Sequence, residues 1–269
     1  MFRIKTGRAF GAVSFAVFTS ASVPTGSTPM AATSTTSMPG PATAAGYTFD
    51  MVTKATSSST IGGPPSGMTA AGIAGPDGSM RLDITALEGG AMSAVGDYYI
   101  VKSGKTMLVR PVTKTFVDIG DGTVAADVTF TGVTATSEKI AGADVIDGRP
   151  TEHLRTTVAY THGIRGQSIP TTIVTDYWLV KLPAAMINPM TGVKYALTTG
   201  PMAALVNKQL EVAPPAAAGV PVKAVITTTR NAMGQSIVST VTAEMKNMKE
   251  GNVDVSKIVM PEGFTKAMR

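Results

Sequence analysis

From Gly46 onward, apolar and polar residues alternate along much of the chain with a period of two. In the run YTFDMVTKAT, Tyr47, Phe49 and Met51 fall on one side, and Asp50 falls on the other. Because successive side chains of a β-strand point to opposite faces, this alternation predicts a strand. Comparable runs predict further strands within 68–85, 97–111, 113–120, 128–140, 150–161, 171–183 and 220–245.

Turn sequences that contain glycine separate these runs. Four of them predict tight reversals of the chain, at Gly75–Gly78, Ser103-Gly104, Asp147-Gly148 and Asn231–Gly234. Short reversals join antiparallel neighbours, whereas parallel strands need long crossover connections. The pattern therefore predicts an antiparallel sheet rather than a repeated strand–helix–strand unit.

One segment departs from the two-residue period. In GPMAALVNKQLEVA, at 200–213, Met202, Leu205, Val206 and Leu210 recur at helical spacing after a Gly-Pro start. A shorter helical turn is expected at 182–189. The predicted fold class is therefore mostly β (α+β), with one or two helices packed on the sheet.

The run TTIVTDYWLVKLP, at 171–183, is apolar on both of its predicted faces. Ile173, Tyr177 and Leu179 share one face, and the only tryptophan, Trp178, lies on the other. Neither face of the sheet is therefore expected to be fully exposed to solvent at this strand. A curved sheet with a helix across its concave side explains the pattern, and such a fold provides an apolar cleft of ligand size.

The first 45 residues differ in composition from the rest. Arg3, Lys5 and Arg8 precede the short apolar run AFGAVSFAVF, a pattern typical of a secretory signal peptide over 1–22. Positions 23–45 are nearly all Ser, Thr, Ala, Pro, Gly and Met, which predicts a disordered linker. We therefore expect one folded domain over 46–269, in the periplasm or secreted, with no membrane span in the mature chain.

The net charge does not indicate a nucleic-acid partner. The chain has 23 Lys and Arg against 18 Asp and Glu, and no acid precedes Asp50. Removal of the signal peptide takes away three cations and leaves a nearly balanced chain. The absence of cysteine excludes a lipid-anchored N-terminal cysteine and, together with only two histidines, argues against a zinc site.

The two histidines do not form a common site in the predicted strand. His153 and His162 are nine residues apart, and an odd separation places side chains on opposite faces of a strand. They can therefore share neither a metal nor a substrate unless a bulge intervenes. No metal or other cofactor is expected.

Other motifs give even weaker evidence for a catalytic or phosphate-binding site. The SGKT sequence resembles the end of a phosphate-binding loop, but Tyr99 stands where its first glycine belongs. No G-x-S-x-G nucleophile elbow is present. Three acids lie within predicted strands and are expected to pair with Arg81, Lys102 or Arg110; these acids are Asp50, Asp83 and Asp176.

Several segments, taken in order, resemble a known group of envelope proteins. They are YTFDM, SMRLDI, DYYIVKSGKTMLVRPVTKTFV, IDGRPTEHLR, YWLVKLP, GVPVKAV and VDVSKIVMPEGF, and they span Tyr47 to Phe264. This order is similar to that of bacterial envelope domains in the superfamily of LolA and LolB, the periplasmic lipoprotein carriers. The resemblance implies a strongly curved antiparallel half-barrel sheet, with one or two helices across a concave face that accepts acyl chains.

We therefore expect an exported, non-enzymatic protein that holds a lipid, an acyl chain or lipoprotein-like cargo in a concave apolar cavity. One alternative is an envelope interaction or sensor module that uses the same face or a sheet edge. A less favoured alternative is a hydrolase that uses a pair of carboxylates. The side chains expected to line the cavity are Trp178, Tyr177, Leu179, Tyr160, Val158, Met202, Leu205 and Val206.

Overall fold

The computed structural model describes residues 43–58, 65–89, 93–102, 105–118, 128–142, 144–164, 167–181, 219–232 and 234–267. These residues form one sheet of twelve strands and a separate hairpin of two. The strands are β1 (Thr43–Ser57), β2 (Ser66–Ala74), β3 (Met80–Glu88), β4 (Tyr98–Lys102), β5 (Lys105–Arg110), β6 (Thr115–Asp118), β7 (Val128–Ile140), β8 (Val145–Ile146), β9 (Arg149–Pro150), β10 (Glu152–Ile164), β11 (Gln167–Val180), β12 (Val220–Ala232), β13 (Gln235–Asp254) and β14 (Thr265–Lys266).

The order of strands in the large sheet is β14-β6-β5-β4-β3-β2-β1-β13-β12-β11-β10-β7. The predicted antiparallel arrangement is confirmed for every neighbouring pair except β6 and β14, which run parallel. The sheet is thus mixed rather than purely antiparallel. Within the described residues its two end strands, β14 and β7, do not pair with each other, so the sheet is open.

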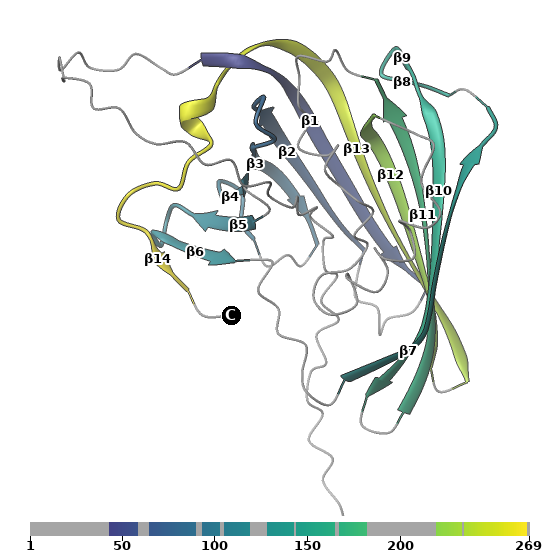
Figure 1. Cartoon of the computed structure of the whole chain (residues 1–269). Coiled ribbons are helices and arrows are strands. Elements are labelled where there is room, and N and C mark those ends of the chain that lie inside the picture. The colour runs from purple at the N-terminus through teal and green to yellow at the C-terminus, as the bar shows by residue number, and fades with distance from the viewer. Residues whose placement is uncertain are drawn as a thin grey trace, which may run out of the picture.

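The sheet bends about its long central strands, β1 and β13, so that its two ends lie on either side of them (Figure 1). Shifts of pairing register occur at four places, on β1, β2, β10 and β11. One of them lies beside Trp178, between this residue and Leu179. Because a bulge bends a strand and increases its twist, these irregularities account for local curvature.

The two faces of the sheet differ sharply in polarity. Directly paired residues on neighbouring strands point to the same face, so a face can be followed across the sheet through its pairs. The outer face carries Tyr98, Asp83, Ala71, Asp50, Lys246, Glu244, Lys223, Trp178 and His153. The inner face carries Tyr99, Leu82, Gly72, Phe49, Met51, Met245, Ala243, Ala224, Tyr177 and Leu154. One polar and one apolar face are typical of an antiparallel sheet that packs on one side.

The C-terminal segment covers one end of the outer face. After β13 the chain makes a 3-10 turn, η2 (Val255–Lys257), and returns along the outside of β4, β5 and β6 to form β14 (Figure 1). Apolar side chains of this segment and of the strands beneath it form a small core: Val255, Ile258, Met260 and Phe264 with Tyr98, Ile100 and Val109.

Two of the predicted reversals lie wholly within the described residues. The backbone N–H of Gly75 donates to the Ser79 carbonyl over 2.8 Å, which closes the turn between β2 and β3. At the next predicted turn, Asp147 and Gly148 both adopt positive φ, at 52° and 73°. This pair closes the separate hairpin of β8 and β9, however, and β10 begins only at Glu152. The expected strand at 150–161 is therefore divided in two.

The predicted helices at 182–189 and 200–213 lie outside the described residues, as do the predicted signal peptide and most of the linker. Within the described residues no helix crosses the sheet, and the helical turn η2 lies at the C-terminal side. In this part of the chain no helix is long and apolar enough to span a membrane. The first described strand, β1, begins at Thr43.

Candidate functional site

The inner face of the sheet carries two clusters of buried apolar side chains. The larger cluster lies on the N-terminal strands and on β11 to β13, and it includes Tyr47, Phe49, Met51, Leu82, Ile84, Leu108 and Met245. The smaller one lies toward the β7 edge and includes Leu154, Val158, Ile173, Tyr177, Leu179 and Ala224. Together they make the inner face apolar from β5 to β10.

Four of the predicted lining residues lie on this inner face. Leu154 pairs with Tyr177 and Val158 pairs with Ile173, which brings β10 and β11 together in one apolar patch. Tyr177 and Leu179 are 2% and 5% exposed, and Val158 is fully buried. Tyr160 is partly buried and packs against the same cluster.

Of the other four predicted residues, the structure describes only Trp178. Trp178 pairs with His153 and points to the outer face, because adjacent residues of a strand face opposite sides. Its side chain nevertheless packs against the larger apolar cluster, so its part in the lining stays a prediction. The helical candidates lie outside the described residues, namely Met202, Leu205 and Val206.

An aromatic group extends the inner patch toward the β7 edge. The ring of Phe130 on β7 stacks against His162 with centroids 5.2 Å apart, and it meets Tyr160 edge-on at 5.8 Å. Burial lowers the pKa of His162, and the nearby Arg230 lowers it further. Burial also raises the pKa of the Tyr160 phenol. Neutral forms of both side chains are thus favoured at this end of the face.

The pairing of β10 with β11 is unbroken from Glu152 to Ile164, so His153 and His162 point to opposite faces. The predicted separation of the two histidines is therefore confirmed. Among the described residues no group of three or more His, Asp and Glu side chains is placed to hold a metal ion.

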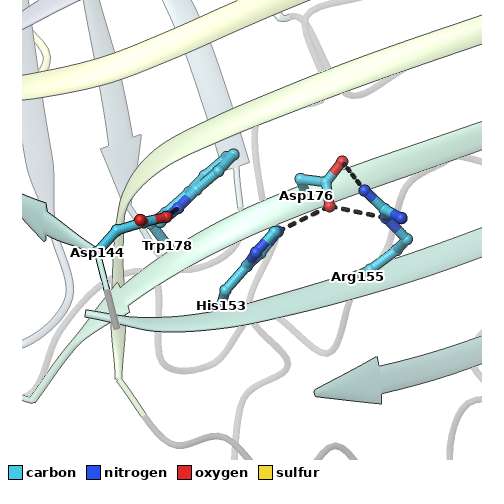
Figure 2. Close-up of polar contacts among 5 residues, drawn as sticks. All are labelled: Asp144, His153, Arg155, Asp176 and Trp178. Carbon is cyan, nitrogen blue, oxygen red and sulfur yellow. Dashed lines mark hydrogen bonds and ion pairs between the residues drawn. The ribbon is translucent and has the colours of Figure 1, made fainter. Parts of the chain in front are cut away.

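A compact polar cluster lies on the outer face, opposite the smaller apolar patch. Figure 2 shows its residues, Asp144, His153, Arg155, Asp176 and Trp178. Asp176 on β11 accepts hydrogen bonds from Arg155 Nε and Nη2, at 2.8 and 3.1 Å, and its Oδ1 lies 2.8 Å from His153 Nε2. The His153 ring stacks on Trp178 with centroids 4.5 Å apart. The indole N–H of Trp178 donates to the Asp144 carboxylate.

Contacts among the side chains of this polar cluster, and with Lys223, hold it together. Both carboxylate oxygens of Asp176 accept from Arg155, and this bidentate pair raises the pKa of the guanidinium. The Lys223 ammonium lies 4.8 Å from the centre of the Trp178 ring, where a cation–π attraction adds to the stacking. The arrangement ties β10, β11 and β12 together on the polar side of the sheet.

The carboxylates singled out by sequence have different partners. Asp83 pairs with Arg81 as predicted, at 2.6 Å. Asp50 instead accepts from the Asn247 amide at 2.7 Å. Asp176 was expected to pair with Arg81, Lys102 or Arg110, and this was wrong, because its partners stand on the adjoining strand β10.

Comparisons with known proteins give only remote likenesses. No protein-family model matches the chain, and no curated protein matches it. Among solved structures, an uncharacterized conserved protein from Thermus thermophilus is 9% identical, with 82% of this chain and 90% of that chain covered and a TM-score of 0.34. A LolA superfamily protein from Nitrosomonas europaea is 7% identical, with 80% and 90% covered and a TM-score of 0.34. A putative outer membrane lipoprotein-sorting protein domain from Vibrio parahaemolyticus is 7% identical, with 76% and 85% covered and a TM-score of 0.28.

The group that the sequence resembles is thus represented among these remote structural likenesses, by a LolA superfamily protein and a lipoprotein-sorting domain.

Proposed function

We propose that this chain is an exported, non-enzymatic binding protein that holds a hydrophobic ligand against the inner face of its curved sheet. The ligand class is a lipid, an acyl chain or lipoprotein-like cargo, and the location is the periplasm or the outside of the cell. No cofactor takes part.

One observation carries the proposal: the inner face is apolar across strands on both sides of β1 and β13, while the described part of the sheet stays open at both ends. The apolar face of a curved, open sheet is the place where a long apolar molecule can pack against this protein. Burial of acyl methylenes against such a surface provides about 0.8 kcal/mol for each methylene, so tight binding requires no catalytic group. Tyr177, Leu179, Val158 and Tyr160 are the contact residues assigned to this face.

Two matched valines test the assignment of the face. Val158 lies on the inner face and Val174 on the outer face of the same strand pair, at neighbouring register positions. The changes Val158→Thr and Val174→Thr keep the shape of the side chain and add one hydroxyl. In a titration with a fluorescent long-chain alkyl probe, Val158→Thr should weaken binding, because the added hydroxyl places a polar group within the apolar patch that the probe contacts. Val174→Thr should leave the affinity unchanged. Equal effects of the two changes, or no binding by the parent protein, would count against the proposal.

An interaction module is the second candidate, and one feature of the sheet favours it. β7 is a 13-residue strand at the end of the sheet, with β10 as its neighbour on one side and no partner among the described residues on the other. An open strand edge can pair with a segment of an envelope protein. A stoichiometric protein complex without lipid, found by size-exclusion chromatography, would favour this candidate over the first.

A carboxylate-dependent hydrolase has less support. Asp50, Asp83 and Asp176 each contact a different partner, and these three acids do not form a pair with one another. Arg155 and His153 engage the most enclosed of them, Asp176, on the polar face.

A further inference from the structure

The hairpin of β8 and β9 connects two strands that are not neighbours in the sheet. Its second strand leads directly into β10, whereas its turn, at 146–149, contacts β13. β12 and β11 lie between β13 and β10, so the hairpin bridges roughly 14 Å along the sheet. Figure 1 shows it at the upper end of the sheet, where β10 begins.

The turn meets β13 at a bulge. Here β13 has two residues, Asn247 and Met248, opposite a single residue of β1. Asn247 adopts a positive φ of 54°, as the first residue of such a bulge often does. The pairing of β13 with β12 has ended before this point, at Glu244. No strand of the described part of the chain therefore pairs with Met248.

Two side chains of the turn bind the backbone of Met248 instead. The Asp147 carboxylate accepts from the Met248 N–H at 3.1 Å, and Arg149 Nη2 donates to the Met248 carbonyl at 3.2 Å. Arg149 Nη1 also pairs with Glu250 at 3.1 Å. A neighbouring strand would supply an acceptor and a donor in the same way, and charged partners strengthen both hydrogen bonds.

The sequence of the turn explains how it presents these groups. Asp147 and Gly148 both have positive φ, which is the geometry of a type I′ turn, and Asp-Gly is a favoured pair there. Ile146, just before them, packs against the larger apolar cluster, which includes Met248. The turn is thus held to β13 by an apolar contact as well as by its charged groups.

The other end of the hairpin is anchored on β11. The Asp144 carbonyl accepts from both the N–H and the hydroxyl of Thr151, each at 2.9 Å, which closes the hairpin at its base. The Asp144 carboxylate accepts from the indole N–H of Trp178 on β11. Since the described part of the sheet is open, no closed ring of strands fixes its bend. A tie between β11 and β13 therefore limits how far this end of the sheet can open.

We infer that the hairpin at 144–151 is a latch that holds the β10 and β11 side of the sheet to β13. The latch is closed in this structure, and release of Asp147 and Arg149 from β13 lets this end of the sheet open. The inference does not depend on which molecule the inner face binds.

The test follows the two ends of the latch separately in the full chain. Hydrogen exchange of the Met248 amide, detected by NMR, reports contact at the turn. Quenching by acrylamide of the only tryptophan, Trp178, reports the base. The amide of Val158 reports opening of the whole sheet, because this residue is paired on both sides, with Ala135 and Ile173.

Two variants release the turn without touching Trp178. Asp147→Gly removes the acceptor and keeps a residue suited to positive φ. Arg149→Met removes the donors and keeps an unbranched side chain. In each variant the Met248 amide should exchange about tenfold faster or more, as expected for loss of a hydrogen bond to a charged group. Acrylamide should also quench Trp178 more readily than in the parent protein.

Glu244→Gln is the matched control, because it breaks an ion pair with Lys246 on the same strand but outside the latch. It should change neither readout, and the Val158 amide should exchange at the parent rate in all variants.

Three results would overturn the inference. Unchanged exchange at Met248 in both variants would show that the turn does not bind β13 in solution. Faster exchange at Met248 without a change at Trp178 would show that the turn only caps the bulge and does not tie two strands together. Equal acceleration at Met248 and Val158 would show that the variants destabilise the whole sheet rather than open one end.

Discussion

Gly46 on β1 lies directly opposite Gly251 on β13, yet only one of the two positions has room for a side chain. A Cβ built on Gly46 would lie 2.2 Å from the Ala74 carbonyl oxygen and 2.6 Å from Cγ2 of Val253. A Cβ on Gly251 would meet nothing within 4 Å. β1, β2 and β13 therefore come together closely at one end of the sheet, where the backbone of Ala74 cannot move aside cheaply.

The two glycines give a matched test of this packing. Gly46→Ala should lower the free energy of unfolding by about 1–3 kcal/mol, because the added methyl group displaces the β2 backbone. Gly251→Ala should be neutral or slightly stabilising, since alanine reduces the conformational entropy of the unfolded chain. Urea unfolding of both variants measures the difference. Equal loss of stability in the two variants would show that the close approach at Gly46 is not present in solution.

The outer polar cluster should contribute to stability rather than to ligand binding. Asp176→Asn removes the charge that holds Arg155 and His153, and we expect it to cost about 1–2 kcal/mol in the free energy of unfolding. Glu262→Gln, on the exposed segment near the C-terminus, is the control and should cost far less. Binding of the alkyl probe should be the same in both variants. A large loss of binding in Asp176→Asn alone would indicate that the ligand binds the outer face, and this would contradict the proposed site on the inner face.

Acid should weaken the β7 end of the sheet through His162. Burial lowers the pKa of this side chain from its ordinary value of 6.5, so the unfolded chain takes up a proton more readily than the folded one. The associated stability is present above pH 6.5 and is lost as the pH falls below it, until the lowered pKa of the folded state is passed. His162→Phe keeps a ring against Phe130 and should flatten the decline in unfolding temperature between about pH 7 and 5.

A second acid-sensitive group acts at lower pH and can be separated from His162. Hydrogen bonding and attraction from Lys181 and Lys139 hold the pKa of Glu152 below its usual 4.5. Its contribution is lost only below that value, so the unfolding temperature of Glu152→Gln should decline between pH 7 and 5 as steeply as that of the parent protein. A decline over that range that persists unchanged in His162→Phe would contradict the assignment to His162.

The alternation of apolar and polar residues predicted which side chains of a given strand lie on the inner face. It placed Tyr177 and Leu179 on one side of β11, and it separated His153 from His162, as the continuous pairing of β10 with β11 shows. The same rule already argued against Trp178 as a neighbour of Tyr177 on one face. The sequence alone shows this, because residues 177 and 178 are adjacent and adjacent residues of a strand point to opposite faces.

Partners on other strands could not be predicted in the same way. The contact of Asp176 with Arg155 and His153 depends on the register of β10 against β11, which a single strand pattern does not specify. The alignment of Ser137, Thr156 and Thr175 depends on register too, since it needs β7, β10 and β11 aligned within one residue. The parallel strand β14, only two residues long, carries no periodicity that could reveal it.

Solvent extraction tests the central claim most directly. The mature protein is purified without added lipid, extracted with organic solvent, and the extract analysed by mass spectrometry beside a mock purification. An apolar inner face that holds a ligand should yield acyl lipid in near-stoichiometric amount, and the extracted protein should then take up a fluorescent long-chain probe. Recovery of no lipid, together with no uptake of the probe by the extracted protein, would contradict the account.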